Sequence, residues 1–398
     1  MQSGGILCYF PFHMVQRSFW LEAIENSWKM KPVVWLAGVE GSGKTSLCQN
    51  FPGVEFFSCD LPEVRRSTEA PGKFLGKLEG KKVALDGIHR LPNVPDVVKA
   101  VADLPSSNLI ITSPVSLEEF FESLDPLREI IFPVCLTPMM SRDLLDFGNQ
   151  DLPRRFLRGG LPPFFLSTSQ PDLEFEKWVD SFWSGVIQAR FRLEKRDSFL
   201  KFLELIIRES GEVFEASRFA SRVGASRPTV TKYIAALEAA GAVWVLRPFS
   251  TARAVEIISA PRTYAFDTGF LRRFRSWTQL REDDFKILWK HWVLNELISR
   301  MQGVQIQYWR DKRGHEVDFV LIRRDLGILT ITAHWKADEF EPGGLRAFRY
   351  HYPAGPNWVV CHDVAQGYAR EFDNVKLEFL SLEDMGQRLS GKGLSHES

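Results

Sequence analysis

The sequence predicts an α/β protein that begins with a doubly wound parallel sheet and continues into two further modules. Three observations support this fold class. A glycine-rich loop follows a short apolar strand, strands alternate with helical stretches early in the chain, and a later pair of helical segments precedes a second run of strands. Alternating strands and helices are typical of a parallel sheet that is covered on both faces and binds ligands at the carboxyl ends of its strands.

Length and composition limit the classes of protein to consider. At 398 residues the chain is too long for one ordinary core, so more than one domain is expected. Fifty basic residues balance fifty acidic ones, and the overall charge gives no reason to expect a nucleic acid or a membrane as partner. The five cysteines lack the spacing of a zinc site or a disulfide framework. No apolar run has membrane-spanning length and no signal peptide is recognisable, so we expect a cytoplasmic protein without a membrane partner.

A phosphate-binding loop is predicted directly after the first strand. Val33–Ala37 is an apolar run typical of a buried parallel strand, and Gly38–Thr45 reads G-x-x-x-x-G-K-T before a helix. Glycines let consecutive backbone N–H groups turn toward a phosphate without clashes, whereas a glycine-rich turn without a ligand would not need this context. The residues predicted to bind ATP are Gly38, Gly41, Ser42, Gly43, Lys44, Thr45 and Ser46.

Three polar side chains have predicted roles at this loop. Lys44 is expected to reach the β- and γ-phosphates, and the Thr45 hydroxyl to bind Mg²⁺, beside the positive end of the helix that starts near Gly43. Asp86 ends the apolar strand 81–86 and is the predicted second partner of the metal. Lys44 and Asp86 are therefore the predicted catalytic residues.

The residue after Asp86 argues against fast hydrolysis. Many ATPases carry a glutamate there that polarises the attacking water, and this chain has Gly87. Because loss of a general base typically costs about 10²–10⁴ in rate, we predict ATP binding and, at most, slow hydrolysis. His89 is either a substitute or a packing residue. Thr112 and Ser113 either sense the γ-phosphate or simply end the next apolar strand.

The order of these segments resembles a family of prokaryotic AAA-type P-loop ATPases that carry a C-terminal domain of unknown function. The matching segments are Asp60–Pro62, Pro71–Phe74, Asp86–Gly87, Ile110–Ser113, Leu136–Pro138 and Gly159–Pro162. The pair Asp86–Gly87 is only half a match, because the family has Asp-Glu there. The resemblance implies that Arg128 completes the nucleotide site of a neighbouring copy in a homo-oligomer; an ordinary surface arginine is the alternative.

A winged helix-turn-helix is predicted in the middle of the chain. Segments 199–207 and 214–224 are predicted to be helical. After a short turn, a further helix is predicted from 227 to 241. Ser226 is the expected N-cap of that helix, followed by Pro228 in its first turn. The wing strands are expected at 242–246 and around 256–258.

The exposed side of the second helix offers candidate DNA contacts. Arg227 and Lys232 are the principal ones, with Thr229 and Thr231 beside them. The local excess of basic residues is typical of phosphate contact. Winged helices also mediate purely protein contacts, and that alternative stays open.

The C-terminal segment resembles the restriction-endonuclease-like fold. A helix at 284–301 precedes a strand at 316–322 with Glu-Val-Asp318 and a further strand at 328–335. Family members carry Glu-x-Lys on the last strand, where this chain has Thr332 and His334.

These replacements remove chemistry that a nuclease needs. Mg²⁺ requires charged oxygen ligands, and only Asp318 and Glu296 remain to supply them. A neutral His334 replaces a lysine poorly, and Lys336 is expected on the same strand face but two residues further along. We therefore expect a degenerate nuclease fold.

These predictions divide the chain into an ATPase core at 1–140, a helical lid or linker at 141–195, a winged helix-turn-helix at 196–275, a nuclease-like domain at 276–390 and a flexible tail at 391–398. The predicted function is that of an ATP-binding, slowly hydrolysing switch that uses ATP and Mg²⁺ to control the two later modules. An ATP-gated metal-dependent nuclease and a non-enzymatic DNA-binding regulator are the alternatives.

Overall fold

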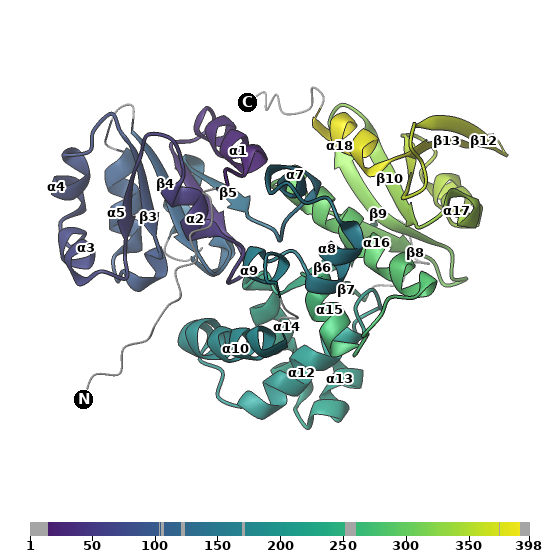
Figure 1. Cartoon of the computed structure of the whole chain (residues 1–398), viewed down its shortest axis with the longest axis horizontal. Helices are drawn as coiled ribbons and strands as arrows, with labels where there is room; N and C mark the ends of the chain where they lie inside the picture. The colour runs from purple at the N-terminus through teal and green to yellow at the C-terminus, as the bar shows by residue number, and fades with distance from the viewer. Residues whose placement is uncertain are drawn as a thin grey trace.

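The computed structural model describes residues 15–102, 104, 107–120, 124–168, 172–250, 260–373 and 375–390. Figure 1 shows a sheet built from the N-terminal part of the chain at the left, a second sheet from the C-terminal part at the right, and a group of helices below and between them. Among the described residues, no helix is both long enough and apolar enough to cross a membrane.

The N-terminal sheet has five strands in the order β2-β3-β4-β1-β5, and all its pairs are parallel. Every residue of the central strand β1 is buried, which explains its continuous apolar sequence. The predicted α/β class and the predicted strands 33–37 and 108–113 are confirmed, and the strand predicted at 81–86 begins one residue later. The strands are β1 (Val33–Ala37), β2 (Val54–Ser58), β3 (Lys82–Asp86), β4 (Asn108–Ser113) and β5 (Ile131–Cys135).

Helices cover both faces of this sheet. Trp20, Ile24 and Trp28 of α1 pack with Leu47 of α2 on one face. Apolar residues of α4 and α5 pack on the other face, so the sheet is doubly wound. The helical segments of this part are α1 (Ser18–Trp28), α2 (Lys44–Gln49), α3 (Pro62–Ser67), α4 (Pro71–Gly76), η1 (Ile88–Arg90), α5 (Val94–Ala102), η2 (Leu117–Phe120) and η3 (Asp125–Ile130).

A helical segment follows and contains one irregular helical stretch near its end. Helix α10 continues without a break into η4, a stretch of wider π-helix of the kind that often occurs at functional sites. The elements are α7 (Ser141–Asp146), α8 (Leu152–Arg158), α9 (Pro162–Phe165), α10 (Asp172–Phe182), η4 (Trp183–Gln188) and α11 (Ala189–Phe191).

The three helices predicted in the middle of the chain are present as α12 (Arg196–Arg208), α13 (Ala216–Val223) and α14 (Arg227–Ala239). Gly224 ends α13 in the left-handed conformation, with φ of 64°. The Ser226 side chain accepts a hydrogen bond from the Thr229 N–H, which confirms the predicted N-cap.

The C-terminal sheet has eight strands in the order β12-β13-β11-β10-β9-β8-β6-β7. Strand β6, expected as part of a wing, pairs with β7 and also with β8, so strands from both expected modules share one sheet. The second expected wing strand, around 256–258, lies outside the described residues. The strands are β6 (Val243–Pro248), β7 (Arg262–Ala265), β8 (Gln307–Arg310), β9 (Glu316–Arg323), β10 (Gly327–His334), β11 (Asn357–Cys361), β12 (Tyr368–Phe372) and β13 (Val375–Leu380).

Four longer helices accompany this sheet. Helix α16 is the helix predicted at 284–301 and buries Leu288, Trp289 and Trp292. The elements are α15 (Thr268–Phe274), α16 (Glu282–Arg300), η5 (Ala337–Glu339), α17 (Gly343–His351) and α18 (Leu382–Ser390). The predicted tail at 391–398 lies outside the described residues.

Candidate functional site

The loop between β1 and α2 has the backbone that its glycines require. Gly41 and Gly43 have φ of 82° and 98°, in the left-handed region that favours glycine. At Gly38 a side chain has no room, because a Cβ atom there would lie 2.5 Å from the backbone oxygen of Leu136. A residue with a side chain at any of these three glycines would therefore distort the backbone of the predicted phosphate loop.

Lys44 is held inside this loop. Its ammonium group donates hydrogen bonds to the backbone oxygens of Gly38 at 2.6 Å and Val39 at 3.1 Å. Burial lowers the pKa of Lys44 to about 8, although the nearby Asp86 carboxylate opposes this shift. The ammonium group is consequently cationic at neutral pH and is bonded to neutral carbonyl groups that an anion can replace.

Asp86 lies where the sequence predicted it, at the carboxyl end of β3 and beside the loop. Its carboxylate accepts hydrogen bonds from the Thr45 hydroxyl at 2.8 Å and the Thr112 hydroxyl at 2.6 Å. A carboxylate and a hydroxyl in contact are oxygen donors of the kind that Mg²⁺ prefers. Ser113 is fully buried, and its hydroxyl accepts a bond from the Val115 N–H, so Thr112 and Ser113 both have local partners.

The pocket around these residues has a volume of about 960 Å³. Lys44, Thr45, Ser46 and Asp86 line it. Residues from the helical segment also contribute to the lining, namely Pro162, Pro163, Leu166, Ser181, Gly185 and Val186. Such a volume is at the upper end of ordinary small-molecule sites and suits a nucleotide. Ser42, within the loop, is fully buried and does not line the pocket.

Side chains from distant parts of the chain form hydrogen bonds with the predicted phosphate loop. The Trp178 indole N–H donates to the Glu40 backbone oxygen at 2.8 Å, and the Ser181 hydroxyl donates to the Glu40 carboxylate at 2.6 Å. The Arg17 guanidinium donates to the Ser42 backbone oxygen at 2.7 Å and forms a buried ion pair with Asp143 at 2.6 Å.

The contacts that Trp178, Ser181 and Arg17 make with this loop are not among those predicted from the sequence. The local signal for them is the Gly159–Pro162 segment. Its glycines allow close packing, because a Cβ atom at Gly160 would lie 2.1 Å from the Arg155 guanidinium. Pro162, which follows these glycines, lines the pocket beside Lys44.

Gly87 follows Asp86 at the position where many ATPases carry a water-polarising glutamate, and His89 lies two residues further along the chain. Gly87 has φ of 79°, so a glutamate there would be strained. His89 lines the pocket, and its Cε1 lies 3.8 Å from the position that a Cβ atom of residue 87 would take. The His89 Nδ1 atom is buried without a hydrogen-bond partner among the described residues. Burial and the neighbouring Arg90 lower the pKa of His89 to about 4, so the ring is neutral at pH 7.

The second carboxylate site, at Asp318 on the C-terminal sheet, is closed in the sense that hydrogen-bond donors of the protein already occupy both carboxylate oxygens. Asp318 accepts hydrogen bonds from the Lys290 ammonium group at 2.7 Å and from the Ala333 N–H at 2.9 Å. Burial alone would raise the pKa of Asp318, but the Lys290 charge keeps it below its usual range. The described residues contain no group of three or more His, Cys, Asp or Glu side chains that could hold a metal.

Two predictions about this second site are wrong. Glu296 does not join Asp318, because its carboxylate accepts bonds from the Ser141 N–H and the Arg300 guanidinium. Lys336 does not extend the strand face either, since β10 ends at His334 and Lys336 pairs with Glu282. Thr332 is buried, and its hydroxyl has no hydrogen-bond partner among the described residues.

The candidate DNA-contact residues lie on the exposed side of α14. Arg227 and Lys232 are exposed and make no ion pair with another described residue. The other two arginines of the basic stretch, Arg218 and Arg222, both pair with Glu209. The Thr231 hydroxyl donates back to the Arg227 backbone oxygen at 3.1 Å, so it is already engaged.

The remaining candidate, Arg128, lies on η3 with its side chain half exposed. It forms an ion pair with Asp125 at 3.5 Å.

Comparisons with known proteins identify similar segments in the later part of the chain. Residues 149–281 match the model of a family described as Domain of unknown function (DUF8612), and residues 285–377 match Domain of unknown function (DUF4143). The chain is 25% identical over 305 residues to "Uncharacterized protein Mb2031c" of Mycobacterium bovis and, equally, to "Uncharacterized protein Rv2008c" of Mycobacterium tuberculosis. In both cases the match covers 72% of this chain and 67% of the relative.

Among solved structures, the chain is similar to the Walker-type ATPase paby2304 of Pyrococcus abyssi, with 14% identity and a TM-score of 0.43 over 66% of this chain and 96% of that one. It is also similar to PH0952 of Pyrococcus horikoshii, a Signal Transduction ATPase with Numerous Domains (STAND) protein, with 13% identity and a TM-score of 0.25 over 70% of this chain and 46% of that one. Both TM-scores are low.

Proposed function

We propose that this chain binds ATP with Mg²⁺ in the pocket after β1 and works as a nucleotide-driven switch. The observation that carries the proposal is the convergence of Lys44, Thr45 and Asp86 on one pocket of about 960 Å³. Lys44 would hold the β- and γ-phosphates, and Thr45 with Asp86 would hold the metal. The bound metal would neutralise charge on the phosphate oxygens.

The contacts of the phosphate loop support the switch role. A phosphate group that takes the Lys44 ammonium from the carbonyls of Gly38 and Val39 must change hydrogen bonding within the loop. The same loop is bonded to Trp178 of α10 through Glu40. It also lies beside the turn after α14, because a Cβ atom at Gly241 would be 3.6 Å from the Val39 backbone nitrogen. Nucleotide state can therefore bias both α10 and α14.

His89 is the residue that we assign to water positioning in a slow hydrolysis. Its Cε1 atom would be in ordinary contact, at 3.8 Å, with a Cβ atom at residue 87, and its buried Nδ1 atom has no hydrogen-bond partner within the described part of the chain. A neutral imidazole can accept a hydrogen bond from the attacking water. Gly87→Glu is not a simple repair of the site, because the left-handed backbone there costs a side-chain-bearing residue about 1–2 kcal/mol.

The test measures ATP affinity and ATP turnover on the same sample, with and without DNA. Saturable ATP binding with slow turnover supports the proposal. His89→Ala should retain ATP affinity and lower turnover by about 10²-fold, with partial rescue by added imidazole. His351→Ala, which changes an exposed histidine away from the pocket, should alter neither quantity. Full turnover in His89→Ala would remove His89 from the mechanism while leaving the binding proposal intact.

DNA binding through a winged helix built on α12–α14 is a second candidate function. Arg227 and Lys232 support it, because both are exposed and neither makes an ion pair within the described residues, so their charges are available for phosphate contact. The Arg227→Glu variant should weaken binding of duplex DNA at low salt and flatten its salt dependence. Unaltered binding at low salt would contradict this reading, and Glu215→Lys, which changes an exposed charge just before α13, serves as a control outside α14.

Two further ideas are kept at the level of hypotheses. An ATP-gated nuclease is disfavoured by the Lys290–Asp318 pair; cleavage of DNA with Mg²⁺ or Mn²⁺ that Asp318→Ala abolishes would revive it. A homo-oligomer in which Arg128 reaches the site of a neighbouring copy predicts turnover per chain that rises with protein concentration and is lost in Arg128→Ala.

A further inference from the structure

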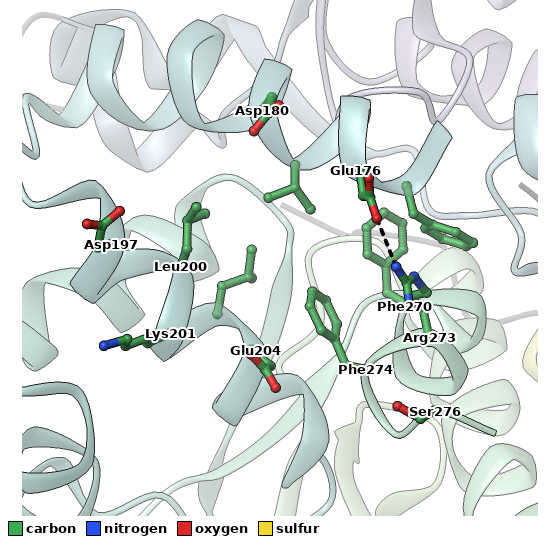
Figure 2. Close-up of a pocket in the computed structure, with 13 residues that line it drawn as sticks. Glu176, Asp180, Asp197, Leu200, Lys201, Glu204, Phe270, Arg273, Phe274 and Ser276 are labelled. Atoms are coloured by element: carbon green, nitrogen blue, oxygen red, sulfur yellow. Dashed lines mark hydrogen bonds and ion pairs between the residues drawn. The ribbon is translucent and has the colours of Figure 1, made fainter. Parts of the chain in front are cut away.

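A second large cavity lies between α10, α12 and α15, with a volume of about 620 Å³. Figure 2 shows side chains of these three helices facing one another across it. Its lining includes six apolar side chains, Phe175, Val179, Leu200, Leu203, Phe270 and Phe274. Phe175, Leu203 and Phe270 are buried, while Val179, Leu200 and Phe274 remain half-buried and form the accessible apolar floor.

The charged lining of this cavity is mainly acidic. The four carboxylates are those of Glu176, Asp180, Asp197 and Glu204, against the two cations Lys201 and Arg273. Arg273 is already bonded to Glu176 at 3.0 Å, and Figure 2 shows the Lys201 ammonium group directed away from the cavity.

Two of the three remaining carboxylates already have exposed arginine partners. Asp180 pairs with Arg196 and Glu204 with Arg208, and both partners of each pair are exposed. Exposed pairs contribute little to stability, so a bound cation could take them over at small cost. Asp197 makes no ion pair with any other described residue. An apolar floor with an acidic border complements a segment that has aliphatic residues on one face and lysines or arginines at its flanks.

Helix α10 connects this cavity to the nucleotide pocket. Val179 and Asp180 line the cavity, whereas Ser181, the next residue, lines the nucleotide pocket. Trp178 and Ser181 bond to Glu40 of the phosphate loop at 2.8 Å and 2.6 Å. A ligand that shifts or stiffens α10 therefore acts on the phosphate loop through two hydrogen bonds.

We propose that the α10–α12–α15 cavity docks a basic amphipathic helix of a partner protein, and that docking and ATP binding influence each other through α10. The docking surface stands by itself, whereas the coupling rests on the proposed ATP site. Because coupling free energies are reciprocal, ATP must change the affinity of the docked helix by the same factor as the helix changes the affinity of ATP.

The first test uses a labelled helical peptide of leucine and lysine, with its leucines on one face, and a matched peptide with glutamate in place of every lysine. Fluorescence anisotropy with the full chain should detect saturable binding of the leucine–lysine peptide only. Leu200→Asp and Asp197→Lys should each weaken it by about tenfold, as expected for loss of a central contact. Glu174→Lys also replaces an exposed acid in the first turn of a helix but lies outside the cavity lining, and it should have little effect.

Equal binding of both peptides, or equal loss with Asp197→Lys and Glu174→Lys, would overturn the docking site. Circular dichroism of each variant checks that it is folded.

The second test repeats the titration with ATP and Mg²⁺. The peptide affinity should change by about fivefold or more, within the usual range of allosteric coupling, and this change should vanish in Lys44→Ala while peptide binding remains. If the wild-type chain binds ATP and the peptide without any mutual effect, the coupling is wrong. If it binds the peptide but not ATP, the proposed ATP site fails and the docking site survives.

Discussion

Asp86 lies on an apolar strand of the N-terminal sheet and Asp318 on an apolar strand of the C-terminal sheet. The two carboxylates differ in their hydrogen-bond partners. Asp86 accepts hydrogen bonds from two neutral hydroxyls, those of Thr45 and Thr112. Asp318 accepts one from the Lys290 ammonium group, and its side chain is only 4% exposed. The first carboxylate lines an open pocket and has no hydrogen-bonded cation among the residues that the structure describes, while the second already has the Lys290 ammonium group.

This difference shows why one motif is a candidate metal site and the other is not. A divalent cation can enter beside Asp86 by replacing contacts with hydroxyls that are themselves oxygen ligands. To enter beside the buried Asp318 it would have to displace the partly buried Lys290 ammonium group and leave that charge without a partner, which is costly. The partner of each carboxylate, rather than the carboxylate itself, distinguishes the two sites.

The largest effect on stability is expected from removing the Lys290 ammonium group. Lys290→Met leaves Asp318 buried and unpaired, and we expect the free energy of unfolding to fall by about 3–5 kcal/mol. Denaturant unfolding followed by tryptophan fluorescence measures it. Lys286→Met is the matched control on the same helix; its ion pairs with Asp283 and Glu339 are more exposed, so it should cost less than about 1 kcal/mol. An equal fall in the free energy of unfolding of the two variants would mean that Lys290 does not neutralise a buried Asp318.

Acid should partly rescue the Lys290→Met variant. In the wild type the folded-state pKa of Asp318 is lowered, so the stability that the pair contributes is present above the unfolded pKa and is lost as pH falls through the folded pKa. Without Lys290, burial would raise that pKa, and the variant should gain stability as the carboxyl takes up a proton. The gap between the two proteins should narrow by about 2 kcal/mol between pH 7 and pH 4. A gap that is constant with pH would contradict this account of the pair.

A smaller effect is expected at the open site. Asp86→Asn removes the charge but keeps the size of the side chain, and we expect it to abolish the increase in ATP affinity that Mg²⁺ produces, a loss of about tenfold. Titrations with Mg²⁺ and with a chelator measure the change. Asp318→Asn should leave the Mg²⁺ dependence of ATP affinity intact. If Asp318→Asn had the effect and Asp86→Asn did not, the assignment of the two sites would be reversed.

Local patterns explain what the sequence could predict. The apolar run Val33–Ala37, the spacing of glycines in Gly38–Thr45 and the cap at Ser226 each depend on neighbours along the chain, and the structure has the strand, the loop and the cap at those positions.

Contacts across the chain could not be predicted in the same way. Arg17 and Asp143 are separated by 126 positions and Lys290 and Asp318 by 28, and no periodicity links either pair. The Lys336 prediction failed for a related reason: it assumed that the strand continued, whereas β10 ends at His334. Such contacts decide whether a recognisable motif is open or closed.

The most direct measurement is isothermal titration calorimetry of ATP with Mg²⁺ into the full chain, with wild type and Lys44→Ala side by side. We expect saturable binding to the wild type and a loss of about 10–100-fold in the variant, because a charged hydrogen-bond donor to phosphate is removed. Lys73→Ala, which removes an exposed lysine from α4, should bind ATP as the wild type does. No binding to the folded wild type at millimolar ATP, or equal binding to Lys44→Ala, would contradict the central claim that this loop holds a nucleotide.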